Sequence, residues 1–171
     1  VDAVSLPLIV DGETGFGGVR NIRRTMRLLE RAGASAIHFE DQFTPRRYRS
    51  AGSPTIPSEE MVDKLKAALD ERRDPKLAII ARSEERSSDA ALIDRLVTYA
   101  ETGVDALWSS VFSATLSLAC ADAIEAKTSS RARIVFFTAR RIAVFYVLVK
   151  IGLCPTSRLE KHCIVPTPSR R

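Results

Sequence analysis

Two carboxylates and a glycine-rich turn form the segment of this chain best suited to chemistry. Asp11 and Glu13 directly follow an apolar run of strand composition, residues 6–10, and precede Gly15 and Gly17. Carboxylate oxygens at the end of a strand suit a hard divalent cation such as Mg²⁺. The alternative is an Asp-Gly turn that carries two solvated acids. The residues alone leave both interpretations open.

Charged residues also end the next two apolar runs of the chain. Glu40 opens the run Glu-Asp-Gln at 40–42, and Arg82 opens the run Arg-Ser-Glu at 82–84. In a parallel α/β fold, ligands bind at the carboxyl ends of the strands. Acids from neighbouring strands could therefore share one Mg²⁺, directly or through its waters. The planar guanidinium of Arg82 suits a substrate carboxylate. Alternatively, Arg82 neutralises Glu40 or Asp11 in a structural ion pair.

These charged residues depend on an alternation of strands and helices. Strand-like runs cover residues 6–10, 36–39, 77–81 and 106–108, and amphipathic patterns predict helices over 21–31, 58–72 and 89–101. Asn21 and Ser58 are placed to cap the first two helices. Gly33 and Gly103 each separate a helix end from a strand, and their separation corresponds to two units of about 35 residues. The pattern indicates a parallel α/β fold, either a barrel or a doubly wound sheet.

The composition changes near residue 110. Residues 1–110 hold 16 Lys and Arg against 18 Asp and Glu, a net charge of −2, whereas residues 111–171 hold 10 against 3, a net charge of +7. All three cysteines lie in the second part, with spacings that match no zinc pattern. We therefore expect one domain over residues 1–110 and a divergent basic tail over 111–171, either frameshifted or partly disordered.

Several functional classes are disfavoured by the composition. No stretch reaches the roughly 20 apolar residues of a membrane span, and the first residues carry no signal-peptide pattern. The arginine-rich face of residues 20–31 lacks the interleaved aromatic side chains that nucleic-acid binding would favour. We expect a cytoplasmic protein that binds neither membranes nor nucleic acids.

Four motifs together resemble one family. They are LPLIVDGETGFG at 6–17, AIHFEDQ at 36–42, PSEEMVDK at 57–64 and IIARS at 79–83. In this order and at this spacing, over roughly residues 4–108, they resemble the isocitrate lyase and phosphoenolpyruvate mutase superfamily, with the methylisocitrate lyase branch the most similar. The resemblance implies an α/β fold of the (β/α)₈ TIM-type barrel. About four βα units of that barrel are visible here, so the barrel is incomplete in this chain.

The resemblance also implies roles for individual residues. The family's metal-site acids, which hold Mg²⁺, correspond here to Asp11, Glu13 and Glu40. Arg82 matches the arginine that binds the substrate carboxylate, and Gly15 and Gly17 belong to the turn beside the metal. The implied reaction is Mg²⁺-dependent cleavage of a carbon–carbon bond in a small 2-hydroxy or 2-oxo di- or tricarboxylate, through an enolate. An intact relative would be a homo-oligomer.

Two positions depart from the family pattern. Glu13 stands where the family usually has Asp, and its extra methylene displaces the carboxylate. In the long loop at residues 43–57, Tyr48 occupies the position of the catalytic cysteine of the lyases and is the candidate catalytic residue. Its ordinary pKa near 10 suits a proton donor better than a base. The alternatives are a cysteine-less member acting as an oxo-acid decarboxylase, hydrolase or phosphonomutase, or an inactive truncated fragment.

Overall fold

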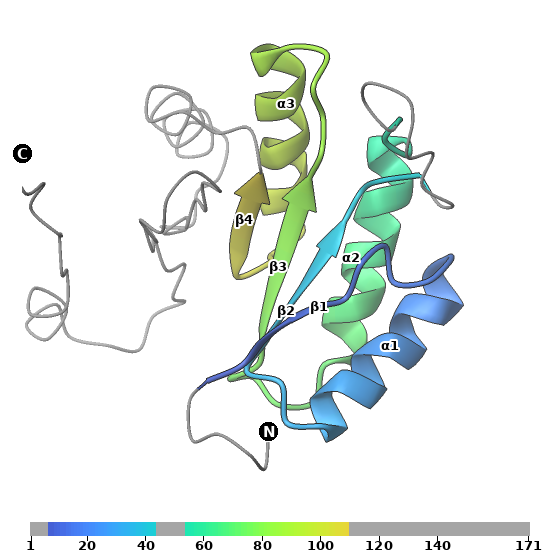
Figure 1. Cartoon of the computed structure of the whole chain (residues 1–171), viewed down its shortest axis with the longest axis vertical. Coiled ribbons are helices and arrows are strands. Elements are labelled where there is room, and N and C mark those ends of the chain that lie inside the picture. Colours follow the sequence, from blue (N-terminus) through green and yellow to red (C-terminus); the bar gives the residue numbers. More distant parts are fainter. Residues whose placement is uncertain (1–6, 44–53, 110–171) are drawn as a thin grey trace, which may run out of the picture.

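Strands and helices alternate throughout the part of the chain that the computed structural model describes, residues 7–43 and 54–109. The order is β1 (Ile9–Asp11), α1 (Val19–Arg31), β2 (Ala36–Glu40), α2 (Ser58–Glu71), β3 (Ala78–Ser83), α3 (Asp89–Ala100) and β4 (Ala106–Ser109). The strands run side by side in one direction (Figure 1). Tyr48 and the basic tail at 111–171 lie outside the described residues.

One face of the sheet packs against all three described helices. Phe39 of β2 and Ile79 of β3 are fully buried on this face, in one cluster with the apolar stripes of the helices. The stripes contain Ile22 and Met26 of α1, Met61 and Leu65 of α2, and Leu92 and Leu96 of α3. On the opposite face, Ala36, Ile80 and Ala106 form a separate small cluster without any helix residue. Successive side chains of a strand point to opposite faces, which explains the two clusters.

The topology of the described sheet is that of a barrel segment. All neighbouring strands are parallel, in the order β1-β2-β3-β4, so each strand pairs with the next one along the chain. A doubly wound sheet reverses its strand order at a switch point and carries helices on both faces. Sequential order with helices on one face is the arrangement of a (β/α) barrel. The doubly wound alternative is therefore wrong.

The predicted elements are all present, but two details differ. The first strand begins at Ile9 and includes Asp11, and β3 extends to Ser83, so the charged residues belong to the strands themselves. The predicted caps are wrong, because Gly18 and Pro57 occupy the N-cap positions of α1 and α2 without side-chain hydrogen bonds. Helix α1 begins as soon as the glycine turn ends, which leaves Asn21 inside its first turn.

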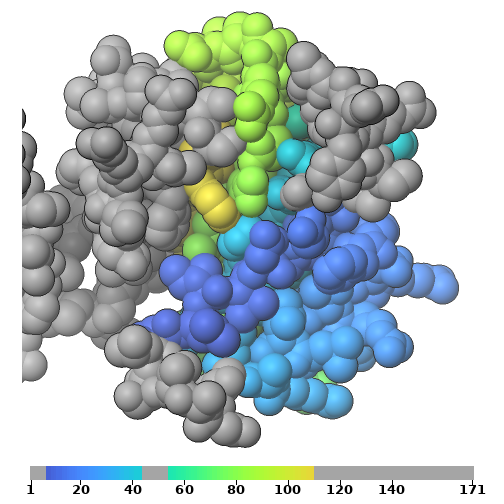
Figure 2. Space-filling model, in the orientation of Figure 1, coloured from blue at the N-terminus to red at the C-terminus, as the bar shows by residue number. Residues whose placement is uncertain are grey.

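β1 is an edge strand of the described sheet. Leu8 and Ile9 are 39% and 43% exposed. In the space-filling view, β1 and α1 lie next to each other at the surface, in dark and medium blue (Figure 2).

Among the described helices, none combines the length and the apolar character of a membrane span.

Candidate functional site at the carboxyl ends of the strands

The structure places Asp11, Glu40 and Arg82 at the carboxyl ends of three neighbouring strands. Strand register aligns Asp11 with His38 and Glu40 with Arg82. Aligned residues of parallel strands share a face, and so do residues two apart in one strand. Asp11, Glu40 and Arg82 therefore lie on the face opposite the helices. The backbone of Glu13 continues to this edge, since the Glu40 amide donates to the Glu13 carbonyl at 2.8 Å.

The turn after β1 has a defined backbone conformation, which is fixed in part by a hydrogen bond between Glu13 and Asp11. The Glu13 amide donates to Asp11 Oδ1 at 2.8 Å, and Glu13 itself has a left-handed backbone with φ of 50°. Gly15 has φ of 76°, which glycine adopts without a steric cost. Gly12 lies against β2, where its amide donates to the His38 carbonyl at 2.9 Å. The predicted glycine turn is therefore present, and it packs directly on the neighbouring strand.

Arg82 is held between two buried carboxylates. Its Nη1 lies 3.2 Å from Glu40 Oε2, and its Nε donates to Glu84 Oε1 at 2.6 Å. The side chains of Glu40 and Glu84 are 0% and 2% exposed. The guanidinium carbon lies 4.3 Å from the ring centroid of Trp108, a cation–π distance. The ion pair with Glu40 that the sequence left open is present, beside a second acid that the sequence analysis did not assign.

His38 lies on the same face as these charges. Its ring meets Trp108 edge-on, with centroids 4.5 Å apart at 84°, and its Nδ1 lies 3.5 Å from Asp11 Oδ1. Burial lowers the pKa of His38, and the positive charge of Arg82 adds to this effect, although the charge of Asp11 opposes it. His38 is therefore a packed, neutral histidine at physiological pH.

The run Glu-Asp-Gln does not act as one acidic group. Both acids are fully buried, but Glu40 contacts Arg82 whereas Asp41 is hydrogen-bonded to Tyr99 of α3. Asp41 Oδ2 accepts hydrogen bonds from Ser83 Oγ at 2.7 Å and from the Tyr99 hydroxyl at 2.9 Å. Burial raises the pKa of Asp41, while these hydrogen bonds and the nearby Arg95 oppose the shift. The alternation of side chains along a strand could have shown from the sequence that Glu40 and Asp41 point to opposite faces. No local pattern predicts that Tyr99 is the partner of Asp41, because the two residues are 58 positions apart.

A second buried charge also escaped the sequence analysis. Lys64 of α2 is 3% exposed, and burial lowers the pKa of its ammonium group, against the attraction of Glu60 and Asp41. Its helix was predicted, but a lysine on an amphipathic helix usually points to solvent. Only the packing of α2 against the sheet reveals that it is buried.

The three acids predicted at the metal site have the ligand chemistry that Mg²⁺ prefers. Asp11, Glu13 and Glu40 offer only oxygen ligands, which hard cations prefer. Within residues 7–43 and 54–109, no three His, Cys, Asp or Glu side chains gather closely enough to form a complete cage. Mg²⁺ retains several waters and commonly binds one or two carboxylates. The oxygen chemistry of these side chains therefore suits Mg²⁺, although the described residues do not form a closed set of ligands.

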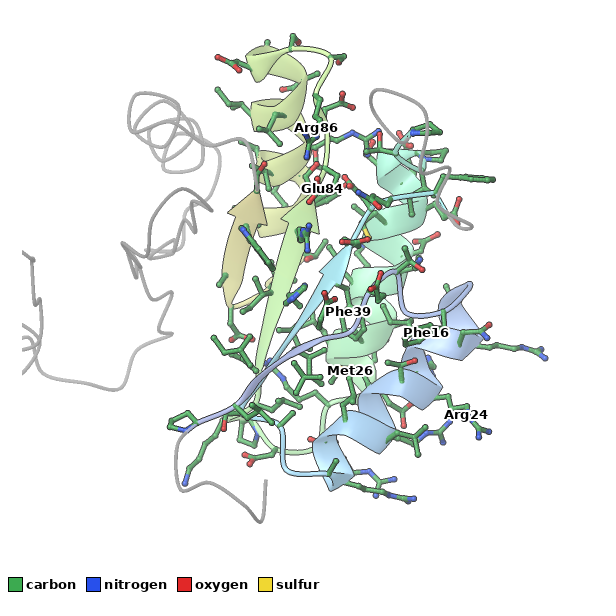
Figure 3. All side chains as sticks on the ribbon, in the orientation of Figure 1. Phe16, Arg24, Met26, Phe39, Glu84 and Arg86 are labelled. Carbon is green, nitrogen blue, oxygen red and sulfur yellow. The ribbon has the colours of Figure 1, made fainter. Side chains whose placement is uncertain are left out.

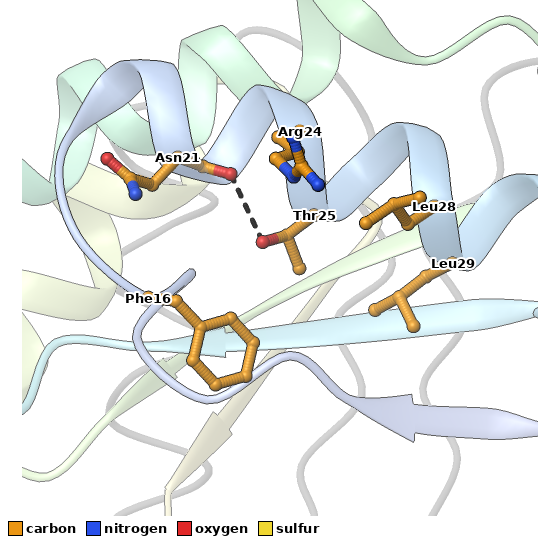
Figure 4. A pocket seen from close by; sticks show the side chains of 6 residues that line it. All are labelled: Phe16, Asn21, Arg24, Thr25, Leu28 and Leu29. Atoms are coloured by element: carbon orange, nitrogen blue, oxygen red, sulfur yellow. Dashed lines mark hydrogen bonds between the residues drawn. The ribbon is translucent and has the colours of Figure 1, made fainter.

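A pocket on α1 lies apart from these charges. It is lined by Phe16, Asn21, Arg24, Thr25, Leu28 and Leu29. In the close view, Phe16 reaches across from the glycine turn toward the side chains of α1 (Figure 4). Phe16 is 64% exposed, and the lining contains no acid and only one cation. Its apolar character does not suit a small dicarboxylate or a metal ion.

Comparison with known proteins identifies relatives of the same architecture. A family model described as phosphoenolpyruvate phosphomutase matches residues 1–142. An oxaloacetate decarboxylase of Rhodopseudomonas palustris (strain ATCC BAA-98 / CGA009) is 40% identical over 129 residues, 74% of this chain and 44% of that protein. A 2-methylisocitrate lyase of Vibrio cholerae is 41% identical over 110 residues, 63% of this chain and 36% of that protein.

Solved structures agree with these sequence relatives. A phosphonopyruvate hydrolase in complex with oxalate and Mg²⁺ superposes with a TM-score of 0.64 at 29% identity, over 79% of this chain and 47% of that one. The chain thus spans less than half the length of these relatives. With the matching family model over most of its length, this chain belongs to the phosphoenolpyruvate mutase and isocitrate lyase superfamily.

Proposed function

We propose that this chain carries the metal- and carboxylate-binding residues of a Mg²⁺-dependent enzyme that cleaves a carbon–carbon bond in a small 2-oxo or 2-hydroxy di- or tricarboxylate. The observation that supports the proposal is that Asp11, Glu40 and the partly buried Arg82 lie on one face at the carboxyl ends of adjacent parallel strands, with the backbone of Glu13 hydrogen-bonded to that of Glu40. In barrel enzymes this end of the strands carries the active site. An anionic substrate would need both a cation and an arginine there, because the acids outnumber the positive charges.

The proposed roles follow the chemistry of each side chain. Asp11, Glu13 and Glu40 would hold the ion and its waters. Bound Mg²⁺ would supply Lewis acidity toward the substrate oxygen on which negative charge develops. Arg82 would bind a substrate carboxylate through its terminal nitrogens. Tyr48, which lies between β2 and α2 in the sequence, would donate a proton, since a phenol is ordinarily protonated at neutral pH.

A second candidate is decarboxylation of a 2-oxo dicarboxylate such as oxaloacetate. It is favoured by Tyr48, because a lyase of the methylisocitrate type would have a cysteine at that position. It is also supported by relatives named oxaloacetate decarboxylase, two of which are 40% and 45% identical to this chain. When such a substrate loses CO₂, the electron pair of the broken carbon–carbon bond moves toward the oxo group, which bound Mg²⁺ would polarise. This step requires no cysteine acid or base. Product analysis with oxaloacetate, methylisocitrate and isocitrate separates the two reactions.

The metal and carboxylate roles can be tested by titration calorimetry with oxalate as the probe. The wild-type chain should bind oxalate only in the presence of Mg²⁺. Asp11→Ala should lose at least about tenfold in apparent affinity for Mg²⁺. Asp70→Ala is the matched control, because Asp70 is 70% exposed and ends α2 away from the site. Equal Mg²⁺ affinities for Asp11→Ala and the wild type would contradict the metal assignment. Mg²⁺-independent oxalate binding would contradict the proposed mode of substrate recognition.

A further inference from the structure

The orientation of Arg82 depends on a carboxylate that the proposed function does not use. Glu84 Oε1 accepts from Arg82 Nε at 2.6 Å and also contacts Nη2 of the same guanidinium. Its other oxygen accepts from Arg86 Nη2 at 3.0 Å. Figure 3 labels Glu84 and Arg86 just beyond the end of β3. Glu84 therefore occupies the edge of the Arg82 guanidinium that carries Nε and Nη2. A ligand carboxylate would have to approach the edge formed by the two terminal nitrogens, Nη1 and Nη2.

Two further contacts fix the plane of this guanidinium. Nη1 lies 3.2 Å from Glu40, on the side of the predicted metal site, and the guanidinium carbon lies 4.3 Å from the Trp108 ring centroid. Glu40 would therefore be shared between Arg82 and the ion. The contacts of Glu84 with Nε and Nη2 oppose the electrostatic attraction between Nη1 and Glu40. Without Glu84, we expect the guanidinium of Arg82 to move toward Glu40, so that both side chains would be less available to ligands.

Glu84 is itself held from the helical side of the sheet. Its amide donates to Asp41 Oδ1 at 2.9 Å. The other carboxylate oxygen of Asp41 accepts from Ser83 and Tyr99, and both Asp41 and Tyr99 are 0% exposed. The hydrogen bonds therefore run from Tyr99 on α3, through Asp41 after β2, to the backbone that carries Glu84. This route links the helical layer with the opposite face of the sheet.

We propose that Glu84 is a positioning residue, which orients Arg82 for a substrate carboxylate, and that Asp41 and Tyr99 hold Glu84 in place. The inference rests on the proposed role of Arg82 as the carboxylate-binding residue. A purely structural role is the competing explanation, because buried ion pairs also stabilise or specify folds. The two explanations differ in whether removing the charge of Glu84 changes the geometry of Arg82.

Trp108 provides a readout of that geometry without any ligand. It is the single tryptophan of the chain, and Arg82 stacks on it. In Glu84→Gln, the emission spectrum of Trp108 should shift toward that of Arg82→Gln, in which no guanidinium covers the indole. Glu101→Gln, an exposed acid at the end of α3, is the matched control and should keep the wild-type spectrum. Unchanged emission in a folded Glu84→Gln variant would overturn the proposal.

Titration calorimetry with oxalate in the presence of Mg²⁺ tests whether Glu84 affects ligand binding. Glu84→Gln should bind oxalate about tenfold more weakly than the wild type, as expected when a residue that supports a ligand-binding group is lost. Tyr99→Phe keeps every charge and should produce the same two changes to a smaller extent. If Glu84→Gln does not fold, Tyr99→Phe decides, and wild-type emission and affinity in that variant would refute the route through Asp41. If the wild type binds no oxalate, the proposed function fails, while the emission measurements still decide whether Glu84 positions Arg82.

Discussion

Replacing Gly12 with alanine should destabilise the fold and weaken Mg²⁺ binding at the proposed metal site. A Cβ at this position would lie 2.6 Å and 2.8 Å from ring carbons of Phe39 and 2.9 Å from the carbonyl oxygen of His38. Ordinary carbon contacts begin near 3.5 Å, so the added atom overlaps its neighbours by roughly 0.6–0.9 Å. Phe39 is fully buried and the carbonyl belongs to a central strand. Neither neighbour can move without disturbing the core.

The expected cost of Gly12→Ala follows from this crowding. Overpacking of a well-packed core costs about 1–3 kcal/mol in the free energy of unfolding. At a urea dependence of about 2 kcal/mol per molar, this corresponds to a decrease of roughly 1 M in the unfolding midpoint. The turn would also move away from β2, separating Glu13 from Glu40, to which its carbonyl is hydrogen-bonded. Apparent Mg²⁺ affinity should therefore fall as well.

Two other glycines separate crowding from backbone strain. Gly18 has φ of −81° and no atom within 4 Å of an added Cβ. Gly18→Ala should therefore change the free energy of unfolding by no more than about 1 kcal/mol. Gly103 has equally open space but φ of 90°, so Gly103→Ala tests the left-handed backbone alone. Urea unfolding of the three variants is the measurement. If Gly12→Ala is as stable as Gly18→Ala, the argument from close packing is wrong.

Two further predictions concern a buried histidine, His38, and a partly buried aspartate, Asp105. Burial lowers the pKa of His38, so the unfolded chain binds its proton more readily below about pH 6.5 and the free energy of unfolding should fall there, by at most about 1.4 kcal/mol per pH unit. The free energy of unfolding, measured by urea at pH 7.5 and at pH 5.5, should therefore differ less between the two pH values in His38→Gln than in the wild type. His162→Gln is the control and should keep the wild-type difference. An equal difference in His38→Gln and the wild type would contradict the assignment. Asp105 Oδ2 accepts from Arg72 Nη1 at 2.6 Å and from the Ile79 amide at 2.8 Å. Asp105→Ala should therefore cost about 2–3 kcal/mol, more than Arg72→Ala, which leaves the strand amide paired, and the reverse ranking in calorimetric unfolding would refute this.

Much of the fold could be predicted from local patterns. Apolar residues at helical spacing, such as Ile22 and Met26, are buried as expected, because a helix repeats its face every 3.6 residues wherever it packs. The four strands were expected from short apolar runs that end in glycine-rich or charged segments. The predictions failed at the caps, where Gly18 and Pro57 precede helices that Asn21 and Ser58 were expected to start.

The candidate site was only partly predictable. Strand ends located Asp11, Glu40 and Arg82 at one edge, because parallel strands joined by helices place their carboxyl ends together. The resemblance assigned Glu40 rather than Asp41 to the predicted metal site, but local patterns did not show what Asp41 binds. Asp41 instead pairs with Tyr99, 58 residues away along the chain.

The sequence by itself determined the order of strands and helices, the apolar stripes and the chemistry available at the strand ends, since these depend on residues close together in the chain. Tertiary structure alone decided that the described helices cover one face, that Glu84 shares Arg82 with Glu40, and that Asp41 binds Tyr99. These outcomes depend on strand register and on contacts between distant segments. Such contacts exist only when the chain is folded, because the burial that makes each charge require a partner is created by packing.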